Sequence, residues 1–106
     1  EMVYERASRK PIAYILNKKF FWKSEFYVNK NTLIPRPDTE ILVEQILKVT
    51  KNKHYLRILD IGVGSGCILL SILKEKKNFY GTGIDISKNS LDIFRINAGN
   101  LTIELK

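Results

Sequence analysis

The sequence has little of what several protein classes require. Its single cysteine, Cys67, excludes an internal disulfide framework and any metal site built from several cysteines. No apolar run approaches the roughly 18 residues that a membrane-spanning helix needs. The N-terminal residues include no apolar segment typical of a secretory signal. We therefore expect a globular protein of the reducing cytoplasm, with no membrane partner and no metal.

The composition supports one folded domain with a net positive charge. The 106 residues are 44% hydrophobic, which is enough for a core, and 18 basic against 11 acidic residues give a net charge of +7. A polyanion such as RNA, or proximity to the ribosome, is one reading of that charge. The basic residues are spread along the chain, and the groups at 18–19 and 74–77 are short. A dispersed basic composition is therefore favoured over a nucleic-acid-binding tail.

The first third of the chain predicts extended structure over residues 12–34. Aromatic runs at 20–22 and 26–28 flank Lys-Ser-Glu at 23–25, which indicates a β-hairpin, and a turn signal follows at 29–31. These aromatic residues could stack on bases, but they lack the interleaved basic pattern of an RNA-binding motif. Packing of the hairpin against the domain is the favoured interpretation.

From residue 37 onward helices and strands alternate. Pro37 suits a first helical turn, and apolar residues at helical spacing follow it, so a helix is expected at about 37–50. Ser87 is a favourable N-cap for a later helix. The further expected elements are strands at 57–61, 79–86 and 101–105 and helices at 67–73 and 87–98. This order predicts an α/β fold with right-handed crossovers and a parallel sheet of strand order 3-2-1.

The most informative segment reads Asp-Ile-Gly-Val-Gly-Ser-Gly, at residues 60–66. Alternate glycines allow a sharp bend from strand to helix and leave the backbone open to a ligand. The helix that follows directs N–H groups at that ligand. Asp85 ends the next strand, 23 residues after Gly62, where an acidic side chain can accept hydrogen bonds from ribose hydroxyls.

The spacing separates two classes of cofactor. A dinucleotide fingerprint, G-x-G-x-x-G, fails here because its last position is Cys67. The observed acidic-x-G-x-G-x-G spacing matches class I methyltransferases that use S-adenosylmethionine (SAM). A plain structural turn is the alternative, and Asp60 is a secondary candidate near the cationic end of SAM. The predicted cofactor-binding residues are Gly62, Val63, Gly64, Ser65, Gly66 and Asp85.

Three other residues have ordinary explanations. Cys67 has no neighbouring histidine or second cysteine, so packing is favoured over a nucleophilic role. His54 stands in a polar stretch without metal-ligand spacing and is expected to be a solvated loop residue. Arg36 either steers an anionic group or pairs with a nearby carboxylate, Asp38 or Glu40, and the sequence favours neither.

Three segments together resemble the HemK/PrmC family, the release factor glutamine methyltransferases. They are Pro-Ile-Ala-Tyr-Ile-Leu at 11–16, the hairpin aromatics, and above all Leu-Ile-Pro-Arg-Pro-Asp-Thr-Glu at 33–40. The resemblance covers about residues 6–100. It departs mildly at Asn17, where a glycine is usual, and at Phe20, where a glutamate is usual.

The resemblance implies a β-hairpin followed by the first half of a Rossmann-like class I SAM-methyltransferase fold. Its cofactor is SAM, held by the glycine loop at 62–66 and by Asp85. Its partner is a peptide chain release factor, methylated on the side-chain amide of the glutamine in a Gly-Gly-Gln motif. The corresponding division is a hairpin linker region at 1–36 and a partial SAM-binding domain at 37–106.

The family's Asn-Pro-Pro-Tyr loop has no counterpart in this chain, whose only prolines are Pro11, Pro35 and Pro37. That loop orients the weakly nucleophilic amide nitrogen. We therefore expect a fragment with no catalytic residues of its own, inactive alone. In such a fragment the strand at 58–61 should be an exposed sheet edge, and one face of the sheet should lack helices. Because exposed sheet edges pair with other chains, we expect the fragment to be marginally stable or to self-associate. Alternatives are an N6-adenine DNA methyltransferase and a non-catalytic basic remnant or nucleic-acid-binding module.

Overall fold

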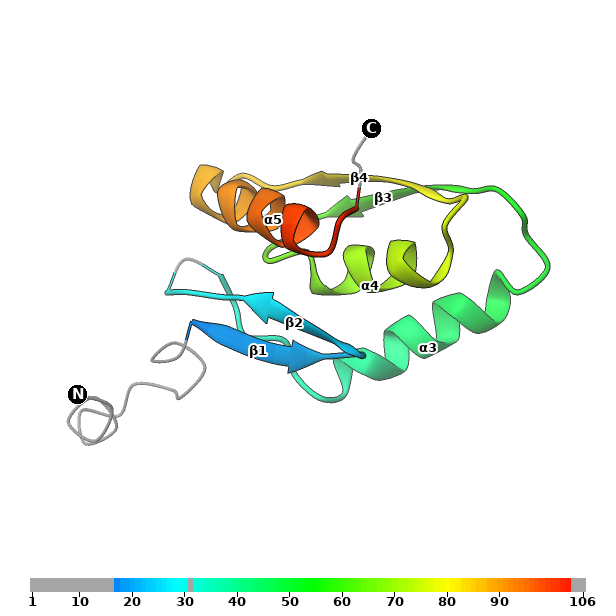
Figure 1. The fold of residues 1–106 in the computed structure, drawn as a ribbon, viewed down its shortest axis with the longest axis horizontal. Coiled ribbons are helices and arrows are strands. Elements are labelled where there is room, and N and C mark those ends of the chain that lie inside the picture. Colours follow the sequence, from blue (N-terminus) through cyan, green and yellow to red (C-terminus); the bar gives the residue numbers. More distant parts are fainter. Residues whose placement is uncertain (1–16, 31, 104–106) are drawn as a thin grey trace.

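The computed structural model describes residues 17–30 and 32–103 of the chain (Figure 1). Within these described residues, two small sheets and three helices form an α/β arrangement. The elements in order are β1 (Lys18–Phe21), β2 (Ser24–Tyr27), α3 (Thr39–Val49), β3 (Arg57–Ile61), α4 (Cys67–Glu75), β4 (Tyr80–Ile84) and α5 (Lys88–Asn100). The predicted alternation of strands and helices is therefore confirmed from α3 through α5. Residues 12–16 of the expected extended region lie outside the described residues.

The hairpin turns one residue earlier than the sequence predicted. β1 and β2 pair antiparallel, and Trp22 and Lys23 form the two-residue loop with φ angles of +53° and +95°. Two positive φ angles are typical of a tight hairpin turn whose twist matches that of the strands. Trp22 is held there because its backbone N–H and its indole N–H donate to Glu40 and Glu75. Asn17, which stands where the family uses glycine, has a φ of +58°, which asparagine tolerates.

Within the described residues, the parallel pair β3–β4 is covered on one face only. α4, α5, α3 and the hairpin all lie on the same side of the sheet in Figure 1. On that side Gly81 and Gly83 lie so close to side chains of α4 and α5 that an added Cβ would clash. On the other side apolar side chains are exposed, among them Leu59 at 58% and Ile61 at 76%. Parallel sheets are normally covered on both faces, whereas residues 17–30 and 32–103 place helices against only one face of this sheet.

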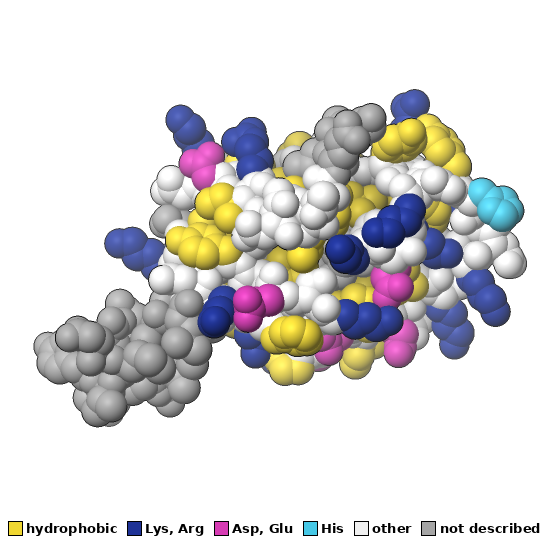
Figure 2. All heavy atoms as spheres, viewed as in Figure 1, with side chains coloured by type: hydrophobic (Ala, Val, Ile, Leu, Met, Phe, Trp, Pro, Cys, Tyr) yellow, Lys and Arg dark blue, Asp and Glu magenta, His cyan; other side chains and the backbone are white. Residues whose placement is uncertain are grey.

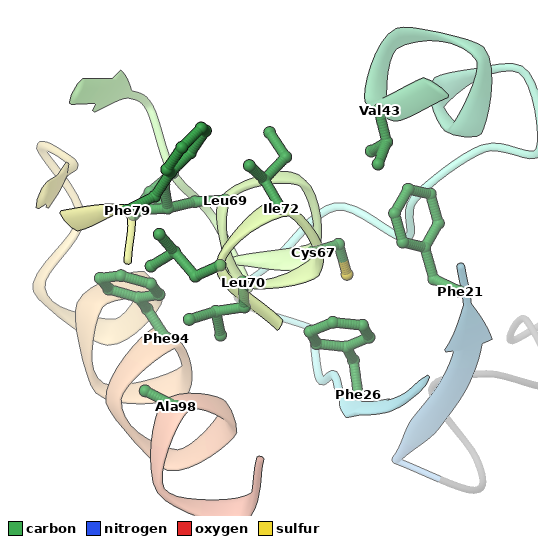
Figure 3. Packing of buried hydrophobic residues seen from close by; sticks show 12 residues of the cluster. Phe21, Phe26, Val43, Cys67, Leu69, Leu70, Ile72, Phe79, Phe94 and Ala98 are labelled. Atoms are coloured by element: carbon green, nitrogen blue, oxygen red, sulfur yellow. The ribbon is translucent and has the colours of Figure 1, made fainter. Parts of the chain in front are cut away.

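The core lies between α4 and the elements around it (Figure 3). α4 is buried on nearly every side, as its sequence predicts, and Leu69, Leu70 and Ile72 are at most 1% exposed. Phe94 of α5 and the hairpin residues Phe21 and Phe26 belong to the same cluster. The expected packing of the hairpin aromatics against the domain is confirmed for these two rings, whereas Phe20 is exposed.

The predicted strand at 101–105 is wrong over the residues that the structure describes. Thr102 N–H donates to the Gly99 carbonyl and Ile103 N–H to the Ala98 carbonyl, with Thr102 at a φ of +59°. This pair of bonds is the Schellman motif, which ends a helix. Leu101–Ile103 are therefore the C-terminal cap of α5, and residues 104–106 lie outside the described residues. The strand order 3-2-1 and the division at residue 36 stay predictions.

The surface shows no concentration of charge in the view of Figure 2. Lys and Arg side chains are scattered over this face rather than gathered over one element, and acidic side chains lie among them. The scatter agrees with a dispersed basic composition. None of the helices in the described ranges is both long and apolar enough to cross a lipid bilayer.

Candidate functional site

A cleft of about 460 Å³ opens where β3 bends into α4. Its volume is within the range of small-molecule sites. We call it the glycine cleft, and its lining comes from the segment at 33–39, from the bend after β3, from the start of α4, from the residue after β4 and from the first turn of α5. The lining residues are Leu33, Ile34, Pro35, Arg36, Thr39, Gly62, Val63, Gly64, Ser65, Cys67, Ile68, Asp85 and Ser90.

Two glycines of the bend leave space at the cleft, and the third does not. A Cβ placed on Gly62 or Gly64 would meet nothing within 4 Å, and both residues have positive φ, +76° and +58°. Gly66 also has a positive φ, +89°, but a Cβ there would lie 2.5 Å from the Phe94 ring. Gly62 and Gly64 therefore give a ligand access to the backbone. Gly66 instead allows α5 to pack closely against the start of α4.

The Asp85 carboxylate stabilises the bend by accepting backbone hydrogen bonds. One carboxylate oxygen accepts a hydrogen bond from Gly64 N–H at 3.0 Å, and the other accepts one from Ser87 N–H at 2.9 Å. The Ile84 carbonyl, one residue earlier, accepts from the N–H groups of Gly62 and Val63. The carboxylate thus lies against the bend as the sequence predicts. Its oxygens retain further acceptor capacity, because a carboxylate offers about four lone-pair positions.

Asp60 lies in β3, one residue before the strand ends and the bend begins. It is half-buried near the end of β3, and it is not among the residues that line the glycine cleft. Burial raises the pKa of Asp60, and the nearby negative charge of Asp85 raises it further. Two neighbouring carboxylates concentrate negative charge at this end of the sheet.

Cys67 and Ser65 are buried together under the bend. The Ser65 hydroxyl and the Cys67 sulfur are 2.9 Å apart, and Cys67 is 5% exposed within the core. Burial raises the pKa of the Cys67 thiol to about 11, although the Ser65 hydroxyl lowers it somewhat. A thiol with so high a pKa is a poor nucleophile at neutral pH. The packing role predicted for Cys67 is therefore supported.

The remaining sequence candidates are at the surface. Arg36 pairs with Asp38, at 3.5 Å between Nε and Oδ1, and it also lines the glycine cleft. His54 is exposed in the loop before β3, as expected. Within residues 17–30 and 32–103 there is no group of three or more potential metal ligands among His, Cys, Asp and Glu.

Sequence reasoning missed Asn97, which supports the bend from behind. Asn97 is fully buried in α5, and its side-chain amide bonds both β2 and the Ser65 carbonyl. The helical spacing offered one signal, because Asn97 falls on the same face as Ile93 and Phe94. A polar residue on an apolar face needs a buried partner.

Comparison with known proteins gives close relatives along nearly the whole chain. A protein of Caulobacter vibrioides is 45% identical over 101 residues, which is 95% of this chain and 35% of the relative. One from Buchnera aphidicola of Schizaphis graminum is 45% identical over 96% of this chain and 37% of its own length. One from Flavobacterium psychrophilum is 50% identical over 85% of this chain and 33% of its own length. Each is named release factor glutamine methyltransferase.

No protein-family model matches the chain. The chain spans about a third of the length of the curated relatives it matches. The identity extends across the hairpin, the segment at 33–40 and the glycine bend together, since each alignment covers at least 85% of the chain. Over the part of these proteins that it spans, the chain is similar to release factor glutamine methyltransferases, which agrees with the resemblance to the HemK/PrmC family.

Proposed function

We propose that this chain binds SAM in the glycine cleft and forms the cofactor-binding part of a release factor glutamine methyltransferase. The observation that carries the proposal is the open bend at Gly62 and Gly64, with the Asp85 carboxylate against it. A Cβ at either glycine would project where no protein atom lies. That space suits the slender methionine arm of SAM, which carries no bulky pyrophosphate.

The lining residues fit the chemistry of such a ligand. Asp85 can accept hydrogen bonds from ribose hydroxyls, while its bond to Gly64 N–H keeps the carboxylate beside the bend. Ile34, Pro35 and Ile68 offer apolar surface on the facing walls. Asp60 and Asp85 supply negative charge near a ligand whose sulfur is cationic. SAM, when bound, supplies an electrophilic methyl group.

The identity of the methyl acceptor is also part of the proposal, and it rests on the relatives rather than on the described residues. The names of the relatives favour the side-chain amide of a glutamine in a release factor over an adenine amino group. A delocalised amide nitrogen reacts only when it is held in line with the methyl group. The resemblance assigns that task to an Asn-Pro-Pro-Tyr loop, a string that these 106 residues do not contain. Methyl transfer therefore requires further residues.

Calorimetric titration of SAM into the chain tests the proposal, with Asp85→Ala as the site variant. Asp92→Ala is the matched control, because it removes the same charge from an exposed ion pair with Arg95 on α5. We expect the wild type and Asp92→Ala to bind SAM with similar affinity and Asp85→Ala to bind it far more weakly. Equal affinity in all three proteins, or binding in none, would reject the site. Salt-dependent binding of RNA without SAM binding would favour the basic-module alternative.

A further inference from the structure

Asn97 is the one fully buried side-chain amide in the described part of the chain, and all of its hydrogen-bonding groups are used. Its Oδ1 accepts from Tyr27 N–H at 2.6 Å, and its Nδ2 donates to the Tyr27 carbonyl at 3.0 Å. The other Nδ2 hydrogen is directed at the Ser65 carbonyl, at 2.8 Å. One side chain thus joins α5, β2 and the glycine bend, which are far apart in the sequence.

On the hairpin side, the Asn97 side chain makes the hydrogen bonds that a neighbouring strand would make with β2. A residue at the open edge of a sheet presents both its N–H and its carbonyl to a neighbouring strand. Tyr27 presents both groups to the Asn97 amide, which has the same donor and acceptor arrangement as a peptide unit. The position of Asn97 therefore depends on where the hairpin docks.

On the cleft side, Asn97 fixes the last peptide plane of the bend. The peptide between Ser65 and Gly66 is planar, so the direction of the Ser65 carbonyl determines the direction of Gly66 N–H. That N–H donates to the Val63 carbonyl at 3.0 Å, across the bend. Asn97 itself does not line the glycine cleft. It can influence a ligand there only through the shape of the backbone.

We propose that Asn97 is a positioning residue, which couples docking of the hairpin to the affinity of the glycine cleft for SAM. The inference rests on the proposed cofactor function. Loss of the Asn97 amide frees the 65–66 peptide to rotate and leaves Tyr27 without its partner. The bend then spends part of its time in conformations that do not fit SAM. The apparent affinity for SAM falls in proportion to the population of the conformation that does fit.

The test compares Asn97→Ala with Val43→Ala. Both residues are fully buried, but Val43 lies on α3 and touches neither the bend nor β2 through hydrogen bonds. SAM affinity is measured by calorimetry at a temperature where unfolding curves show both variants to be folded. We expect Asn97→Ala to bind SAM about fivefold more weakly or worse, as for a typical coupling between sites. Val43→Ala should bind as the wild type does, even where its unfolding temperature falls equally.

An equal loss in both variants, or no loss in Asn97→Ala, would overturn the proposal. If Asn97→Ala does not fold, Phe26→Leu replaces it, since it loosens the hairpin and leaves the amide in place. It too should weaken SAM binding, and an unchanged affinity would overturn the coupling.

If the wild type binds no SAM, the proposed function fails, and the positioning role is then judged on the protein alone. Hydrogen exchange at Gly64 and Gly66 amides should rise in Asn97→Ala and not in Val43→Ala. Equal exchange in the two variants would reject it.

Discussion

Gly66→Ala should lower the stability of the fold more than Gly64→Ala does, although the two residues belong to one motif. Both glycines have positive φ, so alanine at either position is strained by about 1–2 kcal/mol. At Gly64 the added methyl group meets nothing within 4 Å. At Gly66 it would lie 2.5 Å from Cδ1 of Phe94 and 2.9 Å from Cδ1 of Leu70.

The clash at Gly66 adds the cost of overpacking a core, about 1–3 kcal/mol. The free energy of unfolding should therefore fall by about 2–5 kcal/mol in Gly66→Ala, against about 1–2 kcal/mol in Gly64→Ala. Gly99→Ala is the matched control, since Gly99 lies in α5 with open space around it and without positive φ. Alanine there should raise stability by up to about 1 kcal/mol.

Urea unfolding at equilibrium measures all three variants. Phe94→Leu in the Gly66→Ala background provides an internal check, because the smaller side chain relieves the contact. The double variant should be more stable than the sum of the single effects implies. The reasoning is refuted if Gly66→Ala costs no more than Gly64→Ala, or if the two changes are additive.

Three further predictions concern pH, reactivity and association. The pKa of Asp60 is raised in the folded state, so the native protein binds more protons than the unfolded chain above about pH 4. The free energy of unfolding that Asp60 contributes therefore falls as the pH rises and the carboxyl group ionises. Asp60→Asn should raise the free energy of unfolding more at pH 7 than at pH 3, as measured in urea melts. A larger gain at pH 3 than at pH 7 would contradict this. Iodoacetamide at pH 8 should modify Cys67 much more slowly in the native protein than in urea, because the thiol is buried and its pKa is about 11; equal rates would exclude the buried thiol. The exposed Leu59 and Ile61 should make the chain self-associate, so Leu59→Lys should lower the average molecular mass measured by analytical ultracentrifugation. A monomeric wild type whose sharp melting transition does not depend on protein concentration would refute this.

The elements of the fold could be predicted where local chemistry determines them. Ser87 caps α5 as expected, with its hydroxyl accepting from Ser90 N–H. The strand at 57–61 and the bend after it follow directly from the apolar run and the glycines. The boundary of α3 differs, since the helix begins at Thr39 and Pro37 lies in the preceding turn. Boundaries of this kind depend on tertiary packing more than on propensity.

Three features that the sequence did not reveal share a cause, which is that sequence patterns do not specify the partners of a residue. Leu-Thr-Ile at 101–103 alternates as a strand does, but backbone bonds to α5 make it a helix cap. Gly66 stays a predicted cofactor-binding residue, but the sequence did not indicate that Phe94 fills the space beside its Cα. Asn97 was overlooked because its partners, Tyr27 and Ser65, lie 70 and 32 residues away. The open glycines and Asp85, by contrast, lie together as the spacing predicted.

The most direct test of the account is an NMR titration of SAM into the uniformly ¹⁵N-labelled chain. Binding in the glycine cleft predicts that the largest amide shifts fall on Gly62, Gly64 and Asp85. A second groove, lined by Tyr55, Arg57, Tyr80 and Thr82, provides the contrast within the same spectrum. Saturable shifts confined to the first group are the expected result. Shifts confined to that second groove, or no shift at any SAM concentration, would contradict the account.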